Sequence, residues 1–452
     1  MSADVHRGFE RPVTDRSNPA DDLAAPHTPG PQGPPAHGGE REFDLTEAWH
    51  RAGRTARHLD YRPRLTDLGG AWRCRLAHAD RTPVTAGLGT GKGDDDAARV
   101  GAVFEALEHA LTHASALRPD RVVLRTVRDL LVGVWGADPA VLALDPDADA
   151  PLACRTHTAL DGRSPAVDVP VFLTCPSYPG AEAAPLRDAL GDTHDYAPAA
   201  RYSTNSGSAI GSSRTEALVH ALAEVVERDA YSLLLAGLFL GPGGRAARVV
   251  RPESLPGDLA RWHGLARRRV RGPVHVLDMT TDLGVPAFSA HGLSGGGTPV
   301  QGQGASLSAR LALRRALSEL VQCAAVADHD GEEAVTPDLR GLRPYPALLA
   351  AGRADVGRHL GAARPVDFHD TAAPATPGGH LRGLVAAVAA RGHPPDAAES
   401  HTAATGVCVV SVVVPGLERF VAVTGGAPVV PGPRARAQLS GPTMSDGVGF
   451  PG

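Results

Sequence analysis

Residues 203–231 begin with a run of small residues, and the pattern of apolar and polar positions that follows predicts a long amphipathic helix. At about 100° per residue, Glu216, Glu224 and Glu227 share one side of this helix, and Leu218 lies on the other side. The apolar side predicts packing on a core. The acidic side leaves two interpretations open, because carboxylates on a single helix are most often simply solvated.

Two other segments have the same design, which favours a shared role over simple solvation. Residues 92–112 place Glu105 and Glu108 beside an apolar stripe, and residues 302–322 place Glu319 beside a leucine stripe. Each helix follows a glycine-containing loop, and the three copies are roughly a hundred residues apart, which is too far for a solenoid repeat. We therefore predict three pseudo-repeated strand and helix subdomains that each offer one functional helix to a single central cleft.

The rest of the chain alternates strand-like and helix-like patterns, which predicts an α/β fold. Helices are expected over residues 43–59 and 378–392, and a mixed strand and helix over 121–134. Strands are expected over 167–174 and 405–415, and two strands joined by a polar turn over 272–293.

The N-terminal residues 1–41 contain almost nothing that could form a core, because Pro, Gly, His and charged residues dominate them. This composition predicts a disordered extension. We divide the remainder into a helix and strand segment over residues 42–88, which packs on the core, and a main domain over residues 89–452.

Charge and cysteine content exclude several classes of protein. The net charge of -5 argues against a nucleic-acid surface. The five cysteines are scattered and include no C-x-x-C pair, so they indicate neither a disulfide framework nor a zinc site. A reducing cytoplasm is the expected location, and no apolar run approaches the roughly 18 residues that a membrane span needs. Lys92 is the only lysine and lies between two glycines, which leaves a phosphate contact and chance survival equally open.

The acids of the three helices would crowd several negative charges together if the helices face one cleft. Such a cluster is stable only with cations, and carboxylate oxygens suit Mg²⁺, which is often shared with the phosphates of a nucleotide. Arg228 and Arg315 lie near these acids in sequence and would offset phosphate charge. The residues therefore point to magnesium-dependent nucleotide chemistry.

The same three segments carry a resemblance to a known family. SAIGSSRTEALVHALAEVVERDA resembles the signature of YcaO-domain proteins, in which a small-residue loop precedes E-A and then E-x-x-E-R-D. GKGDDDAARVGAVFEALEH and GQGASLSARLALRRALSELVQ are similar to the first and third motifs of that family. VLDMTTDLGVPAFSA and VVVPGLERF are similar to further stretches, and all of them occur in the family's order.

The resemblance implies a YcaO fold that binds ATP and several Mg²⁺ ions and phosphorylates the oxygen of a peptide backbone amide. By motif position, the metal would be held by Glu105, Glu108, Glu224 and Glu227. The nucleotide would be surrounded by Ser212, Glu216, Arg228, Arg315 and Glu319, with Lys92 as a further candidate. We assign catalysis to the four metal-holding glutamates together with Arg315 and Glu319.

The resemblance also implies a ribosomally synthesised peptide as substrate. A Cys, Ser or Thr side chain as nucleophile would give an azoline, and external sulfide would give a thioamide. We expect a separate leader-binding or sulfur-handling partner and a homodimer.

Three positions depart from the family's motifs. His109 stands where the first motif usually has Arg, Ser212 where the second often has Asn, and Ala324 where the third often has Arg. The chain also ends GVGFPG and not in the Pro-x-Pro-x-Pro tail of many azoline-forming members. Two alternatives therefore stay open: a degenerate scaffold that binds nucleotide or peptide without turnover, and a metal-dependent hydrolase.

Overall fold

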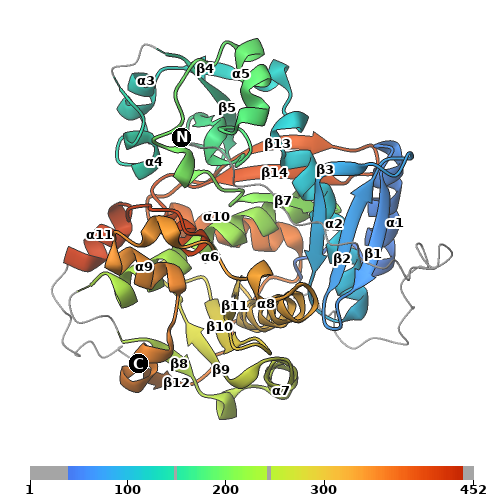
Figure 1. The fold of residues 1–452 in the computed structure, drawn as a ribbon, viewed down its shortest axis with the longest axis vertical. Coiled ribbons are helices and arrows are strands. Elements are labelled where there is room, and N and C mark those ends of the chain that lie inside the picture. The colour runs from blue at the N-terminus through green and yellow to red at the C-terminus, as the bar shows by residue number, and fades with distance from the viewer. Residues whose placement is uncertain (1–38, 147–149, 242–245, 441–452) are drawn as a thin grey trace.

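The structure is a computed structural model that describes residues 39–146, 150–241 and 246–440. Three sheets, each with its own helices, meet around the centre of the molecule (Figure 1). The mixture of helices and strands confirms the predicted α/β fold. Each of the three acidic helices directly follows a strand of a different sheet, although the predicted internal repeat stays a prediction.

The first sheet is antiparallel, with strand order β1-β2-β3. Helices α1 and α2 bury apolar side chains against this sheet and against each other. Its elements are α1 (Leu45–His58), β1 (Arg62–Asp67), β2 (Trp72–Ala77), β3 (Pro83–Gly91) and α2 (Asp95–Thr112).

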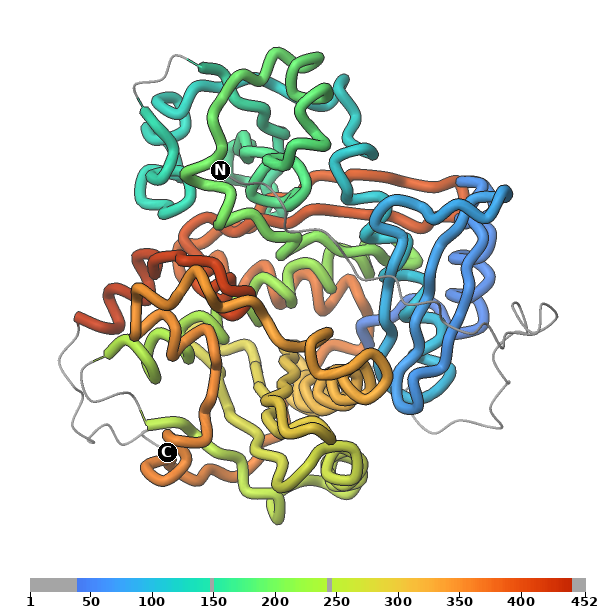
Figure 2. Tube along the Cα trace, in the orientation of Figure 1, coloured from blue at the N-terminus to red at the C-terminus, as the bar shows by residue number. Residues whose placement is uncertain are grey.

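The second sheet combines strands that lie far apart in the sequence. Strand β14 pairs with β7 and with β13, so the red and green segments run side by side in Figure 2. The strand order is β4-β5-β13-β14-β7, and β6 pairs with β5. Its strands are β4 (Val123–Arg125), β5 (Leu152–Ala159), β6 (Val167–Pro170), β7 (Ser208–Gly211), β13 (Asp396–Thr402) and β14 (Cys408–Val413). The helices nearest to it in sequence are α3 (Val127–Val132), α4 (Pro139–Leu142), α5 (Ala184–Leu190) and α6 (Arg214–Phe239).

The third sheet has the order β11-β10-β9-β8-β12. Helices α7 and α8 share one hydrophobic core with its strands. Its strands are β8 (Arg248–Val250), β9 (Arg271–Asp278), β10 (Ala287–Leu293), β11 (Pro299–Ala305) and β12 (Arg364–Val366). The remaining α-helices of the described ranges are α7 (Gly257–Arg269), α8 (Ala309–Asp330), α9 (Pro346–Arg353), α10 (Pro377–Ala389) and α11 (Pro433–Ser440).

Helix α6 lies at the centre of the fold and is longer than the sequence pattern predicted. The Ser213 side chain accepts a hydrogen bond from the backbone N–H of Glu216, which caps its N-terminus. Most of its residues are buried, including Glu216 and Tyr231 on the acidic side. The interpretation of α6 as a helix with solvated acids is therefore wrong. The preceding run of small residues is also more than a loop, because it contains β7.

Most of the other predicted elements occur near their predicted positions. The strand predicted over 405–415 is β14, which is buried along its whole length. The strand predicted over 167–174 ends early, at Pro170, and a 3-10 turn follows, since proline has no N–H to continue a strand ladder. Residues 1–38 of the predicted disordered extension lie outside the described residues, whereas residues 39–41 are described and Glu40 is buried.

Glycines let the three acidic helices approach their strands unusually closely. A Cβ atom on Gly91 would lie 1.7 Å from a backbone oxygen of α2, and one on Gly302 would lie 2.3 Å from a backbone oxygen of α8. A Cβ on Gly211 would lie 2.4 Å from a backbone nitrogen of α6. Real side chains cannot make such contacts, so these glycines set the depth at which each helix sits.

None of the helices in the described ranges has the length and hydrophobicity to cross a membrane. All five cysteines are free, and four of them are buried.

A buried histidine makes the stability of the protein sensitive to acid. His157 is fully buried beside Ser411, and burial lowers its pKa to about 3. The unfolded chain takes up a proton near pH 6.5 and the folded chain does not, so stability is complete above pH 6.5 and falls as the pH drops toward 3. We expect a loss of about 1.4 kcal/mol per pH unit in this window.

Urea denaturation at pH 7 and pH 5 measures this loss. The substitution His157→Gln should make the difference between the two pH values smaller, whereas His50→Gln, at an exposed site, should leave it unchanged. Equal pH dependence in all three proteins would contradict the prediction.

Candidate functional site

Acidic side chains from the three helices converge on one cleft. The Lys92 ammonium, just after β3, forms an ion pair with Glu319 of α8. Burial lowers the pKa of Lys92, but the charges of Glu319, Glu227 and Glu105 outweigh burial and raise this pKa overall. Acids from α2, α6 and α8 therefore surround a single ammonium group, which confirms the convergence of the three helices.

Backbone groups tie the acids of α2 to the neighbouring units. The backbone N–H of Ile210 in β7 donates to Glu108 Oε2 at 2.9 Å. The backbone N–H of Thr90 holds Glu105, and the Thr90 carbonyl accepts a hydrogen bond from Gln322 Nε2 of α8. Hydrogen bonds thus join α2 to β7 of the second sheet, and α8 to β3 of the first sheet.

The cleft contains more acidic than basic side chains, and burial and this excess of acids raise the pKa values of carboxyl groups in it. Burial and then the charge of Glu319 raise the pKa of Glu227 to about 7. Burial, together with Glu224 and Glu105, raises the pKa of Glu108 well above its usual range. These carboxyl groups are therefore poised to take up cations.

Two cationic side chains, Lys92 and Arg228, partly offset this charge. The Arg228 guanidinium lies 3.5 Å from the Glu224 carboxylate. Burial lowers the pKa of Arg228, but the charges of Glu224 and Glu227 outweigh burial and raise this pKa overall. Within the described ranges, no three His, Cys, Asp or Glu side chains are arranged as a preformed metal site. The carboxylates still suit Mg²⁺ chemically, since they are hard oxygen ligands with excess negative charge.

The N-terminal end of α6 faces a different set of groups. Glu216 is buried and its Oε2 accepts from the backbone N–H of Ser212 at 3.0 Å. Arg315 of α8 donates to Glu40 Oε2 at 2.6 Å. His220 lies between this end and the acids, and burial followed by the charge of Arg315 lowers its pKa. His220 is therefore neutral and carries no salt bridge.

Sequence reasoning missed Glu40, which lies in a proline- and glycine-rich stretch with no helical or strand periodicity. Its side chain is 3 % exposed and accepts a hydrogen bond from Ser306 Oγ at 2.5 Å. Glu40 lies inside the run predicted to be disordered, so no local signal in the sequence singled it out.

A cavity of about 760 Å³ lies on the other side of the acids. Glu319 and Gln322 of α8 form one wall, and residues of β9, β10 and β11 form the floor. The floor carries the polar side chains of His275, His291, Gln301 and Gln303, and Arg271 of β9 also lines the cavity. Tyr231 of α6 donates to Gln301 at its edge. This volume lies within the range of ligand pockets, and sequence analysis did not identify it.

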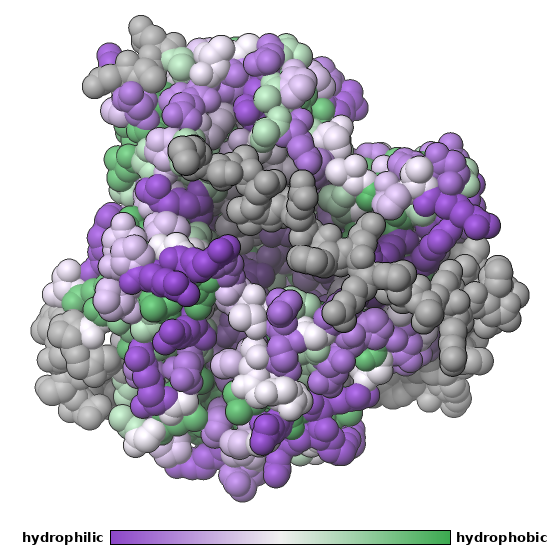
Figure 3. All heavy atoms as spheres, in the orientation of Figure 1, coloured by the Kyte–Doolittle hydropathy of each residue, from purple (hydrophilic) through white to green (hydrophobic). Residues whose placement is uncertain are grey.

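Helices α6 and α8 order these features in the same way. Along α6, Glu216 comes first, the acids follow, and Tyr231 reaches the cavity. Along α8, Arg315 comes first, Glu319 follows, and Gln322 reaches the cavity. The acid cluster therefore separates the Glu216 and Arg315 end from the cavity. The face in Figure 3 is hollowed near its centre, where the three parts of the fold meet.

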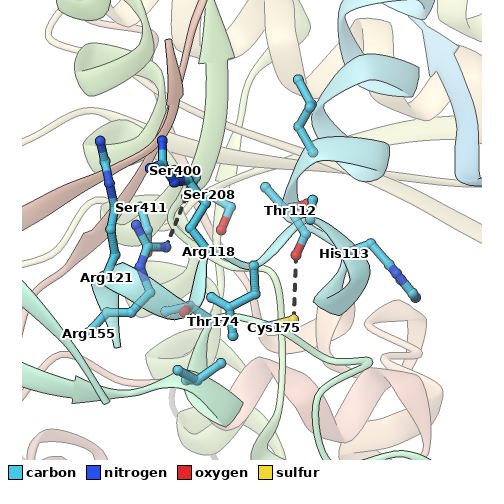
Figure 4. Close-up of a pocket in the computed structure, with 14 residues that line it drawn as sticks. Thr112, His113, Arg118, Arg121, Arg155, Thr174, Cys175, Ser208, Ser400 and Ser411 are labelled. Atoms are coloured by element: carbon cyan, nitrogen blue, oxygen red, sulfur yellow. Dashed lines mark hydrogen bonds between the residues drawn. The ribbon is translucent and has the colours of Figure 1, made fainter. Parts of the chain in front are cut away.

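A second pocket, near the C-terminal end of α2, is too small for a nucleotide. Its volume is about 30 Å³, enough for one or two water molecules. Figure 4 shows Arg155 hydrogen bonded to Ser400, at 3.0 Å, and the Cys175 thiol directed toward the Thr112 carbonyl, at 3.4 Å. The first contact joins β5 to β13, and the second joins α2 to the segment that follows β6.

The positions that depart from the family's motifs have different surroundings. His109 Nδ1 is 2.6 Å from the Leu88 carbonyl oxygen at the edge of the first sheet. Ala324 is fully buried in the core of the third sheet and α8. Ser212 is buried beside Glu216. Only Ser212 therefore lies in the part of the site formed by Glu216 and Arg315.

Residues 90–418 match the family described as YcaO cyclodehydratase, ATP- and Mg²⁺-binding, which is well over half of the chain. The chain belongs to the YcaO family. The predicted cofactors, ATP and Mg²⁺, are those of this family, and its description supports an ATP-dependent enzyme. A comparison with curated proteins finds no significant match.

Solved structures of YcaO proteins share this fold. YcaO from Methanopyrus kandleri, bound with AMPPCP and Mg²⁺, is 21% identical with a TM-score of 0.60, over 86% of this chain and 95% of that chain. A heterocyclase in complex with substrate and cofactor is 18% identical with a TM-score of 0.59. That match covers 87% of this chain and 55% of the heterocyclase, so this YcaO protein spans about half the heterocyclase's length.

A third relative is a component of a complex. The E. coli microcin synthetase McbBCD is 14% identical with a TM-score of 0.51, over 79% of this chain and 88% of that chain. At these identities the three likenesses establish the fold of the YcaO protein alone.

Proposed function

We propose that this YcaO protein uses ATP and Mg²⁺ to phosphorylate the oxygen of a peptide backbone amide. The observation that carries the proposal is the convergence of acids from α2, α6 and α8 around Lys92, between the Glu216 and Arg315 end and a cavity of about 760 Å³. One side of the acids has groups suited to a nucleotide, and the other has room for a peptide. Phosphoryl transfer needs such an arrangement, since positioning and charge neutralisation supply most of its catalysis.

The proposed roles follow the positions of the side chains. Glu105, Glu108, Glu224 and Glu227 would hold Mg²⁺, which supplies neutralisation of phosphate charge when bound. The nucleotide would contact Ser212, Glu216, Arg228, Arg315 and Glu319. Lys92 would exchange its pairing with Glu319 for a phosphate, as an ammonium group on a glycine-rich loop can do.

The chemistry begins at the amide carbon of the substrate. A nucleophile adds there, the electron pair of the C=O bond moves to oxygen, and this oxygen takes the γ-phosphoryl group of ATP as ADP leaves. Phosphate then departs with the former amide oxygen. A side-chain nucleophile of the peptide gives an azoline, and sulfide gives a thioamide.

The floor of the cavity supports a peptide as substrate. Histidine and glutamine side chains carry hydrogen-bond donors and acceptors, as a peptide backbone does. Gln301 Oε1 already accepts from Tyr231 and His291 Nε2 is hydrogen bonded to Ser289, so their remaining groups would pair with the peptide. Burial lowers the pKa of His291 to about 3, so it stays neutral and is suited to hydrogen bonding. Because the microcin synthetase relative is a complex, we also propose a separate partner that delivers the peptide.

A degenerate scaffold is the second candidate function. The observation that favours it is the ion pair of Lys92 with Glu319, which places an ammonium group where a metal ion is expected. A scaffold of this kind would bind nucleotide or peptide without forming ADP.

Nucleotide binding tests the proposal directly. We expect AMPPCP with Mg²⁺ to raise the melting temperature. At an AMPPCP concentration of a hundred times the Kd, the free energy of unfolding should rise by about 2.7 kcal/mol. Without Mg²⁺ the shift should largely disappear, because the acids then repel the phosphates. An equal shift with and without Mg²⁺, or no shift at all, would overturn the proposed function.

A further inference from the structure

Residues 39–43, which we call the N-terminal strap, enter the cleft at the Glu216 and Arg315 end. Glu40 is buried there with both carboxylate oxygens engaged. Its Oε2 accepts from Arg315 Nη2 at 2.6 Å and its Oε1 from Ser306 Oγ at 2.5 Å. His380 Nδ1 lies 3.6 Å from the same Oε1. A carboxylate is thus held by a guanidinium and a hydroxyl, as a phosphate oxygen would be.

The backbone of the strap also hydrogen bonds to Glu216, the second charged group at this end. The N–H groups of Glu42 and Phe43 donate to Glu216 Oε1 at 2.5 and 3.4 Å. Arg41 lies 3.7 Å from Glu216 Oε2. A ligand hydroxyl or amino group could donate to Glu216 Oε1 only by replacing these backbone donors.

The strap is fixed at both of its ends. At one end the Phe43 ring lies under the Arg51 guanidinium, 3.7 Å from the ring centroid. At the other, Gly39 has φ +80°, and a Cβ there would lie 2.4 Å from the Pro374 carbonyl oxygen. The seated strap therefore requires glycine at position 39, whereas a displaced strap would tolerate a side chain.

We propose that the N-terminal strap is an internal competitor of the nucleotide, with the Glu40 carboxylate standing in for a phosphate group. The inference rests on the proposed function, because that assigns Arg315 and Glu216 to the nucleotide. Arg315 and Glu216 cannot bind the strap and a nucleotide at the same time. Nucleotide binding therefore requires displacement of the strap, and the observed affinity is reduced by the fraction of molecules in which the strap is seated.

Single substitutions in the full chain test the competition, with AMPPCP and saturating Mg²⁺ as the probe in calorimetry. Glu40→Gln keeps the shape but removes the charge that holds Arg315, so we expect a Kd about tenfold lower than in the wild type. Gly39→Ala strains only the seated strap and should lower the Kd in the same direction. Glu42→Gln is the matched control, because it removes the same charge from an exposed side chain of the strap, and its Kd should not change.

Hydrogen exchange gives a readout that a merely structural role would not move. If the strap competes, the amides of Glu42 and Phe43 should exchange faster when AMPPCP and Mg²⁺ bind, while the amides of α6 become more protected. Slower exchange in the strap, or an unchanged or higher Kd for Glu40→Gln, would overturn the inference. If neither the wild type nor the variants bind AMPPCP, the proposed function fails as well. If the wild type and all variants bind AMPPCP with equal affinity, the strap mechanism is overturned and the proposed function is not.

Discussion

Replacing Glu227 with glutamine should lower ATP hydrolysis at least about 100-fold while leaving the fold intact. Glu227 is the acid whose pKa burial and Glu319 raise to about 7, so a neutral amide suits the metal-free cleft better than the carboxylate does. The same amide cannot supply the negative charge that Mg²⁺ needs. Activity and stability should therefore move in opposite directions in this variant.

The stability difference has a definite pH dependence. The folded protein holds the Glu227 proton up to about pH 7, whereas the unfolded chain releases it near pH 4.5. Stability from this group is complete below pH 4.5 and is lost as the pH rises through 7. Without Mg²⁺, Glu227→Gln should gain more stability over the wild type at pH 8 than at pH 5.

Phosphate release, AMPPCP titration and urea denaturation measure these effects together. Glu105→Gln should behave like Glu227→Gln in activity, and Glu253→Gln, at an exposed site, should match the wild type. Full hydrolysis by Glu227→Gln would show that this acid does not serve the reaction. A wild type that binds AMPPCP but forms no ADP when it is given ATP would favour the scaffold interpretation.

Replacing Gly91 with alanine should destabilise the protein by about 3 kcal/mol or more, the largest stability effect that we expect from a single methyl group. The new Cβ would lie 1.7 Å from a backbone oxygen of α2 and 2.5 Å from a backbone nitrogen of the same helix. Backbone atoms cannot rotate away as a side chain can. Helix α2 must move off β3, and Glu105 and Glu108 would move with it.

The measurement combines urea denaturation with AMPPCP binding. Gly302→Ala should have a similar effect through α8, because its Cβ would lie 2.3 Å from a backbone oxygen there. Gly361→Ala is the matched control, since a Cβ at that position meets nothing within 4 Å, and it should change stability by less than about 0.5 kcal/mol. A Gly91→Ala variant as stable as this control would contradict the close approach of α2 to β3.

Periodicity identified the acidic helices because amphipathic patterns are local. The 3.6-residue period places Glu224 and Glu227 on one side of α6 whatever the rest of the chain does. The pattern could not distinguish a solvated side from one that lines a cleft. That distinction depends on Glu319 and Lys92, which are more than two hundred residues apart and form an ion pair in the fold.

The parts of the site that sequence reasoning missed have no local signature. Glu40 lies in a stretch without periodicity, and its burial depends on Arg315 and Ser306, far away in the chain. The cavity floor is also invisible in the sequence, because His275 and His291 become neighbours only through the antiparallel pairing of β9 and β10.

The sequence by itself determined the α/β class, the three acidic helices and the membership of the YcaO family, since all of these follow from residue types at fixed spacing. Only the tertiary structure decided that the acids share one cleft, that the N-terminal strap lies against Arg315 and Glu216, and that a cavity adjoins Glu319. The reason is physical: helix periodicity is set by neighbouring residues, whereas contact between distant segments is set by how the three sheets pack.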